Sequence, residues 1–117
     1  MTAEKLLSLR SVRREISRTK RRMADMTRQA EQAGNDSVLL CAIAAERALL
    51  DSYILKLRRE EAELLEFINS IDDAHLREIF MLRYFDGVKT WQRVAFLAGE
   101  HDESYVRRKH NTYLKKN

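Results

Sequence analysis

The sequence has few of the residues that interrupt a helix. Among its 117 residues there is no proline, and glycine occurs only as Gly34, Gly87 and Gly99. Each glycine falls where a helical pattern of apolar residues breaks, which is where glycine is best tolerated. Hydrophobic residues make up 44% of the chain and charged residues 34%, as in soluble, helix-rich proteins. These features predict an all-α fold.

Cysteine is also scarce. The single Cys41 cannot form a disulfide within the chain, which fits a reducing compartment such as the cytoplasm of a bacterial host. It lies in the longest apolar run, residues 38–45, which is far shorter than the ~20 residues of a membrane-spanning helix. We therefore expect neither a membrane span nor a signal peptide. Between a reactive thiol and a small core residue, we favour the core residue, because nothing cationic lies beside Cys41.

Patterns that indicate catalysis or metal binding are missing. The histidines, His75, His101 and His110, are scattered, and no CxxC or HxxxH pair has the spacing of metal ligands. Asp72 and Asp73 precede a predicted helix, where capping is a more common role than acid–base or metal chemistry. Neither a glycine-rich phosphate loop nor a nucleophile motif occurs. We expect no enzyme and no cofactor, and we interpret His110 as a partly buried core or interface residue.

Apolar residues in the first 71 positions follow the three-four spacing of a coiled-coil seam. The spacing predicts helices over residues 3–33 and 38–70, with Gly-Asn-Asp-Ser at 34–37 as the break. Because the break is short, the helices are expected to form a long antiparallel, coiled-coil-like hairpin. The seam of the first helix comprises Leu9, Val12, Ile16, Thr19, Met23, Met26, Ala30 and Ala33. That of the second comprises Leu39, Ile43, Leu50, Tyr53, Leu57, Leu64, Phe67 and Ile71.

The charges of the two helices support the same hairpin. Residues 1–30 contain nine Lys and Arg against three Asp and Glu, whereas residues 31–70 contain four against eight. A fold-back at Gly34 pairs residues whose numbers add to 72 or 73, such as Ile16 with Leu57. Exposed ion pairs contribute only ~0.2–1 kcal/mol each, so their main expected effect is to select the pairing.

The cations of the first helix are open to two interpretations. They are either an arm that binds DNA or the solvated flank of a coiled coil. The acidic character of the second helix favours the flank, since a hairpin would bring opposite charges together. The cluster comprises Arg10, Arg13, Arg14, Arg18, Lys20, Arg21 and Arg22.

The second helix has a wider apolar surface than one partner helix requires. A helix that is apolar on two faces is usually buried on both. The second face is expected to pack on the C-terminal segment or on another subunit. We favour a homo-oligomer, a dimer or larger, because a two-helix hairpin rarely holds a core alone. The additional apolar residues are Leu40, Ala44, Leu49, Ile54 and Leu65.

Residues 72–116 are predicted to form three short helices. The first ends at Asp86-Gly87, because glycine tolerates the left-handed backbone that terminates a helix. The hydroxyl of Thr90 can cap the second helix by accepting a backbone N–H, and Gly99 follows that helix. The apolar residues of the first helix are Leu76, Ile79, Phe80, Leu82 and Phe85, and those of the second are Trp91, Val94, Ala95, Leu97 and Ala98.

The third of these helices is rich in cations. Asp102, Glu103 and Ser104 are its candidate caps. A short apolar helix, a tight turn and a basic helix with its own inward stripe form the helix-turn-helix pattern. The residues predicted to face inward are Val106, His110, Tyr113 and Leu114. Those predicted to face outward are Arg107, Arg108, Lys109 and Asn111.

Two stretches of this segment resemble region 4 of the bacterial sigma-70 family. They are LRYFDGVKTWQRVAFLAG at residues 82–99 and SYVRRKHNTYLKK at residues 104–116. The resemblance is closer still to small phage late-transcription regulators of the RinA and ArpU type, and it covers about 45 of the 117 residues. The residues that set its register are Leu82, Arg83, Phe85, Gly87, Trp91, Val94, Ala95, Gly99, Val106 and Arg107.

The resemblance implies a sigma-region-4-like domain that binds double-stranded DNA, and also a contact with RNA polymerase. Nothing upstream resembles a promoter-melting domain, so a complete sigma factor is not implied. The expected organisation is a helical hairpin for oligomerisation over residues 1–71, followed by a three-helix DNA-binding domain over residues 72–117.

In a helix-turn-helix, the last helix enters the major groove and its N-terminal residues reach base edges. Over residues 103–115, Arg107 or Arg108 is expected to contact a guanine edge and Asn111 an adenine. Phosphate contacts are expected from cations and polar groups at the end of this helix and at the start of the preceding one. The full predicted contact set is Lys89, Thr90, Gln92, Arg93, Ser104, Tyr105, Arg107, Arg108, Lys109, Asn111 and Lys115.

The leading hypothesis is a sequence-specific transcriptional regulator of phage or prophage type. One alternative is a small terminase subunit, which marks DNA for packaging and predicts a ring of subunits. Another is a protein-interaction module whose helix-turn-helix does not bind DNA. The sequence leaves the target DNA and the choice between activation and repression open.

Overall fold

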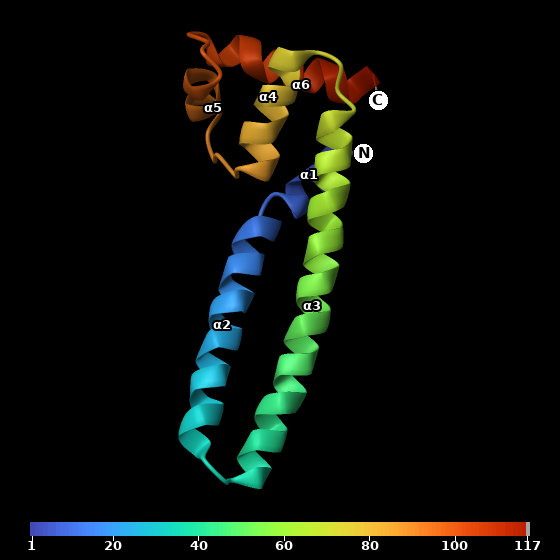
Figure 1. Ribbon diagram of the computed structural model, residues 1–117. Coiled ribbons are helices and arrows are strands. Elements are labelled where there is room, and N and C mark those ends of the chain that lie inside the picture. The colour runs from blue at the N-terminus through green and yellow to red at the C-terminus, as the bar shows by residue number, and fades with distance from the viewer. Residues whose placement is uncertain (117) are drawn as a thin grey trace. The chain divides into compact units, whose positions relative to one another are not determined.

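The structure is a computed structural model that describes residues 1–116. Within this range the regular secondary structure is entirely helical, which confirms the all-α prediction (Figure 1). No helix in the described part of the chain has both the length and the apolar character needed to cross a membrane. The elements are α1 (Ala3–Leu9), α2 (Val12–Ala33), α3 (Ser37–Asn69), α4 (Ala74–Phe80), the π-helix η1 (Met81–Phe85), α5 (Trp91–Leu97) and α6 (Glu103–Lys116).

The chain divides into two compact units. The hairpin unit is Arg14–Arg59, and the larger unit joins Met1–Arg13 to the chain from Glu60 onward. This division differs from the predicted boundary between residues 71 and 72. The reason is that α1 and the last turns of α3 contribute buried side chains, such as Leu6 and Ile68, to the larger unit.

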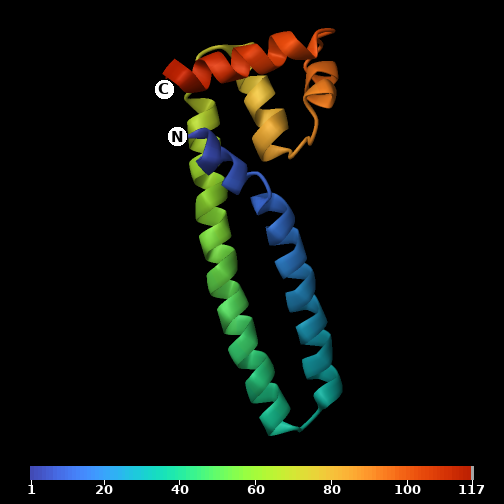
Figure 2. The same cartoon turned by 180° about the vertical axis from the view of Figure 1, so that it is seen from behind.

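Within the hairpin unit, α2 and α3 run side by side in opposite directions (Figures 1 and 2). Gly34 lies in the connection with a φ of 60°, a left-handed conformation that favours glycine. Asp36 then accepts a hydrogen bond of 3.1 Å from the backbone N–H of Leu39, which caps the start of α3. The buried side chains of this unit come from the predicted seams: Ile16, Thr19, Met26, Ile43 and Leu57.

Two side-chain contacts join α2 and α3 across the hairpin unit. Arg22 donates to Glu46 at 2.5 Å, and the hydroxyl of Tyr53 donates to Glu15. In both pairs the residue numbers add to 68, about one helical turn from the predicted 72 or 73, a distance that long side chains bridge. Ile16 and Leu57, which were predicted to face one another, are both buried. Ser37 already begins α3, so the break is one residue shorter than predicted.

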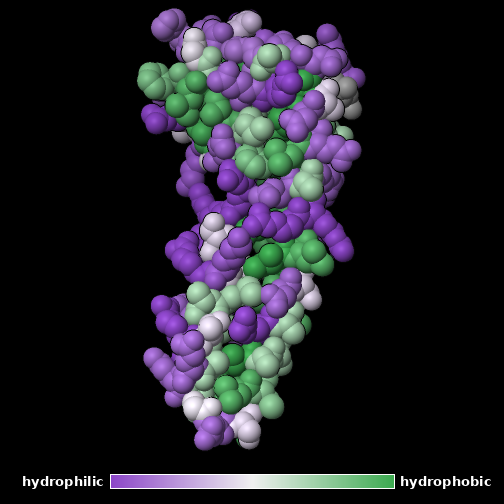
Figure 3. Space-filling model, viewed as in Figure 1, coloured by the Kyte–Doolittle hydropathy of each residue, from purple (hydrophilic) through white to green (hydrophobic). Residues whose placement is uncertain are grey.

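Part of α3 leaves apolar side chains on the surface of the hairpin unit (Figure 3). Leu55 is 55% exposed and Leu49 is 71% exposed. Cys41 is also exposed, so the prediction of a core position for this residue was wrong. A shallow depression on the same unit is lined by Ala30, Leu40, Ile43, Ala44, Arg47, Ala48 and Asp51.

The helix predicted over residues 3–33 is interrupted at Arg10 and Ser11. On the N-terminal side of the break, Leu6 and Leu9 are buried in the larger unit. The guanidinium of Arg10 donates a 3.0 Å hydrogen bond to the carbonyl of Val88. These contacts draw α1 onto residues far away in the sequence, so local periodicity alone does not reveal the break.

The C-terminal helices of the larger unit pack around a small apolar core. Its buried members are Ile79 from α4, Val94 and Ala95 from α5, and Val106 from α6. Trp91 packs against this group from the start of α5. A second cluster is aromatic and centres on the fully buried Phe80. These two clusters set the orientation of α6, which crosses the ends of α3 and α4 (Figures 1 and 2).

The first predicted C-terminal helix continues to Phe85, but its second half is π-helical. The N–H of Asp86 donates to the carbonyl of Met81, five residues earlier, at 2.9 Å. Gly87 follows with a φ of 72°, which confirms the predicted stop. The wider turn places Tyr84 in a buried position, where it faces α6.

Candidate nucleic-acid interface

The candidate site begins at the N-terminus of α5. The hydroxyl of Thr90 accepts a 3.2 Å hydrogen bond from the backbone N–H of Arg93, which confirms the predicted cap. Lys89, Gln92 and Arg93 are exposed beside it. Thr90, Gln92 and Arg93 line a shallow depression together with Phe96, whose ring lies 5.8 Å from the guanidinium carbon of Arg93.

The orientation of α6 follows from two buried side chains one helical turn apart. Val106 is fully buried and His110 is 4% exposed. Because residues four apart share a helix face, these two anchors turn Arg107, Arg108 and Asn111 outward, where all three are exposed. The inward and outward positions agree with the prediction at these five residues.

The first turn of α6 presents polar and aromatic groups. The carboxylate of Asp102 accepts a 2.9 Å hydrogen bond from the N–H of Ser104, so of the three candidate caps Asp102 makes this contact. Ser104 and Tyr105 are exposed, and Tyr105 shows 41% of its surface. Lys115 is exposed near the end of the helix.

The two exposed arginines are held by weak contacts within α6. Arg107 lies 3.5 Å from a carboxylate oxygen of Glu103, and Arg108 donates to the carbonyl of Ser104 at 3.3 Å. Exposed pairs of this kind contribute little stability, so both guanidinium groups can exchange these contacts for others. Their five N–H donors match the acceptor edge of guanine and the oxygens of a phosphate.

His110 lies inside an aromatic box. Its ring stacks on Phe80 at 4.8 Å between centroids and meets the edge of Trp91 at 4.7 Å. Nδ1 is 2.9 Å from the side-chain oxygen of Asn111, which can only accept, so Nδ1 carries the proton. Nε2 then accepts from the hydroxyl of Tyr84 at 2.5 Å. This arrangement satisfies both ring nitrogens of a neutral His110.

Burial keeps this box uncharged. It lowers the pKa of His110 from its usual 6.5 and raises the pKa of the Tyr84 hydroxyl. The hydrogen bond between the Asn111 oxygen and His110 competes with the predicted contact of Asn111 to adenine. A bidentate contact to adenine requires both the oxygen and the nitrogen of the amide, and here the oxygen already has a partner.

The pKa of His110 makes stability depend on pH. As the pH falls below about 6.5, the unfolded chain gains a proton at His110 that the folded chain resists, so unfolding becomes more favourable. We expect the free energy of unfolding, measured with urea, to decrease between pH 7.5 and pH 5. The decrease should be smaller in His110→Gln, and His101→Gln, at an exposed position, should behave as wild type. An equal decrease in His110→Gln would contradict the assignment.

Lys109 differs from its predicted role as an outward phosphate ligand. Its ammonium lies 3.0 Å from the carboxylate of Asp73 and 3.2 Å from Nδ1 of His75, and its side chain is 23% exposed. Nε2 of His75 is 3.3 Å from Glu100, outside hydrogen-bond geometry. Asp73 also accepts from the N–H groups of His75 and Leu76. Lys109 therefore ties α6 to the start of α4, although it also lines a surface depression with Tyr105 and Arg108.

Asp73 itself has a lowered pKa. The first cause is the backbone hydrogen bond from Leu76, and the contact with Lys109 adds to it. The carboxylate is thus stabilised in its charged form by the helix that it caps and by α6. The sequence indicated the cap, but not the contact with Lys109, which lies 36 positions later.

Arg83 is a structural residue that the contact set did not include. Its guanidinium donates to the carbonyl of Lys89 at 2.5 Å and lies 4.5 Å from the ring centre of Trp91. It therefore holds the loop between η1 and α5 and positions the start of α5. The resemblance to sigma region 4 includes Arg83, but local periodicity gives it no role.

The structure brings the predicted residues together in two groups, one at the start of α5 and one on the outward side of α6. Among residues 1–116, no three His, Cys, Asp or Glu side chains gather as a metal site. Comparison of the chain with known protein families, characterised proteins and solved structures finds no match.

Proposed function

We propose that the protein is a sequence-specific DNA-binding transcriptional regulator of phage or prophage type. In this proposal α4, α5 and α6 form a sigma-region-4-like helix-turn-helix domain, and α6 enters the major groove. The observation that carries it is the two-sided character of α6: Val106 and His110 are buried, while Arg107 and Arg108 are exposed. A recognition helix needs this separation, because one side must hold the helix while the other reaches bases.

The contact residues divide by role. Arg107 and Arg108 are the proposed base-reading residues, because a guanidinium can donate two parallel hydrogen bonds to guanine. Ser104 and Tyr105, in the first turn of α6, are also within reach of base edges. Phosphate contacts are assigned to the exposed polar residues at the two helix ends: Lys89, Thr90, Gln92, Arg93 and Lys115.

The test of this function is selection of duplexes from a random pool by the full chain. A sequence-specific reader should enrich one recurring sequence, and that duplex should compete better than its scrambled version at physiological salt. Binding without enrichment would contradict base reading. Failure to bind any duplex would favour the protein-interaction alternative.

We further propose that two copies associate through the α3 face that holds Leu55. The hairpin unit buries few apolar side chains, yet leaves Leu55 on its surface. Arg47 and Asp51, one turn apart, line the neighbouring depression. In an antiparallel pairing about a two-fold axis, Arg47 of each copy meets Asp51 of the other, and Leu55 of each copy lies level with the depression of the other. A second copy thus complements this face in both charge and apolar character.

The expected mass in solution is that of a dimer, measured by light scattering. Leu55→Glu should shift the mass toward the monomer, because it buries an unpaired charge in the interface. Leu49→Glu is the matched control: Leu49 is also exposed, but lies about a third of a turn away around α3. A dimer that survives Leu55→Glu would contradict this face. A large ring of subunits would favour the terminase alternative.

A further inference from the structure

Five of the arginines in residues 1–33 fall into two groups, which differ in whether they have an acidic partner. One group has acidic partners: Arg13 lies 3.8 Å from Glu61, and Arg22 lies 2.5 Å from Glu46. A second group comprises Arg14, Arg18 and Arg21, which we call the basic stripe. Within the described residues, 1–116, none of these three arginines has an acidic partner within 4.0 Å.

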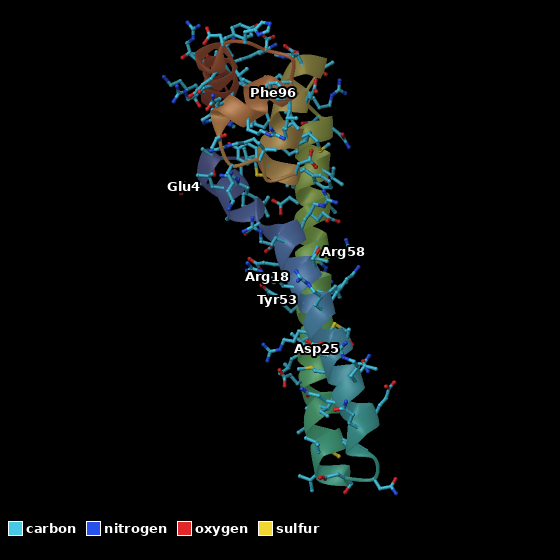
Figure 4. The ribbon with its side chains drawn as sticks, turned by 90° about the vertical axis from the view of Figure 1, so that its left-hand side faces the viewer. Glu4, Arg18, Asp25, Tyr53, Arg58 and Phe96 are labelled. Atoms are coloured by element: carbon cyan, nitrogen blue, oxygen red, sulfur yellow. The ribbon has the colours of Figure 1, made fainter. Side chains whose placement is uncertain are left out.

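The basic stripe occupies one face of α2. Its members are spaced by four and three residues, so they share a face and extend for about 10 Å along the helix. Ile16 and Thr19, which lie between them in sequence, are buried on the other side, toward α3. Figure 4 views the molecule from the α2 side and labels Arg18. The three guanidinium groups thus project away from the hairpin core.

Pairing between the two helices does not explain this stripe. Arg13 and Arg22 face acidic residues, as the hairpin hypothesis requires, but the stripe lies on the side of α2 that points away from α3. Like charges at positions four apart on a helix repel one another, so Arg14 and Arg18 weaken α2 in the absence of an anionic partner. The spacing between neighbouring members is close to that of successive phosphates along a DNA strand.

We propose that the basic stripe is a second DNA-binding surface, which contacts the phosphate backbone without reading sequence. This inference rests on the proposed function, because it adds phosphate contacts to a protein that already reads DNA through α6. Duplex DNA fits better than a membrane surface. A membrane-bound helix needs an apolar face to insert, and the apolar face of α2 is buried against α3.

The experiment compares salt dependence in three variants of the full chain. Arg14→Gln/Arg18→Gln/Arg21→Gln removes the stripe, and the equivalent Arg→Lys triple variant keeps its charge. A control removes three exposed cations elsewhere on the hairpin unit, Lys20, Lys56 and Arg59, also by substitution with Gln. Helicity by circular dichroism should be equal in all of them, since Gln and Lys are good helix formers.

Each phosphate contact contributes a slope of about 0.9 to the dependence of log affinity on log salt. Loss of three contacts should lower this slope by about 2.7. When salt is raised from roughly 50 to 200 mM, the factor by which the affinity falls should therefore be about 40 times smaller in the Gln variant than in wild type. Preference for the selected sequence should be unchanged. The Lys variant and the control should both retain the wild-type slope.

Three results would overturn the assignment. A wild-type slope in the Gln stripe variant would show that the stripe does not touch DNA. Loss of binding to phosphatidylserine vesicles, with the DNA slope unchanged, would assign the stripe to membranes. A wild type that binds no duplex at any salt concentration would overturn both this inference and the proposed function, whereas the first two results leave base reading by α6 intact.

Discussion

Simultaneous replacement of Arg107 and Arg108 by alanine is expected to abolish the preference of the protein for its selected duplex. Both side chains are exposed, and they contact Glu103 and Ser104 within the same helix. A bidentate contact to a base contributes about 1–3 kcal/mol of discrimination, so each lost contact should reduce the preference by roughly 5- to 150-fold. The fold should be unaffected, because neither residue belongs to the core.

The measurement is competition between the selected duplex and its scrambled version, at fixed salt, with a footprint on the selected site. Lys115→Ala is the matched control on α6, because a phosphate contact should weaken binding to both duplexes equally. A footprint that persists in the double variant would refute the assignment of these arginines. A footprint lost together with helicity would instead point to a role in folding.

The sequence predicted those parts of the structure that depend on local pattern. The three-four spacing identified Ile16, Met26, Ile43 and Leu57 as buried, since a helix repeats its faces at that interval. The cap at Thr90 likewise depends only on neighbouring residues. The orientation of α6 was predictable for the same reason, because its apolar and cationic residues lie on different faces.

Features that depend on distant residues were not predictable. The break at Arg10 accompanies a contact with Val88, and the position of Lys109 depends on Asp73, at the start of another helix. Cys41 has an apolar sequence environment but is exposed, because one partner helix covers only one side of α3.

The π-helical turn is a further case. Residues 81–85 are apolar or aromatic apart from Arg83 and continue the pattern of α4, and nothing local marks the change of helix type. The extra residue in the turn brings the hydroxyl of Tyr84 to His110. The same hydrogen bond joins the end of the first C-terminal helix to the side of α6 that lies opposite the proposed base-reading arginines. The sequence did not indicate the hydrogen bond between Tyr84 and His110, because the two residues lie 26 positions apart.

Phe80→Ala is expected to have the largest effect on stability of any single substitution in the larger unit. The side chain is fully buried and contacts three other aromatic side chains besides His110: Phe67 at 5.9 Å, Tyr84 at 5.6 Å and Tyr113 at 5.5 Å between ring centroids. Truncation of a buried phenylalanine to alanine costs about 3–5 kcal/mol, because it removes buried apolar area and leaves a cavity. These partners lie on α3, η1 and α6, so the cavity would weaken the packing that holds α6, the proposed recognition helix.

Urea unfolding followed by circular dichroism measures this cost, and Phe96→Ala is its matched control. Phe96 is 71% exposed, so its truncation should change the free energy of unfolding by less than about 0.5 kcal/mol. Phe80→Ala should also lose DNA binding as it unfolds, and binding should return when conditions restore the fold. That recovery separates it from the Arg107 and Arg108 variant, in which binding is lost from a folded protein. A Phe80→Ala variant as stable as wild type would mean that α6 is not held by this aromatic cluster.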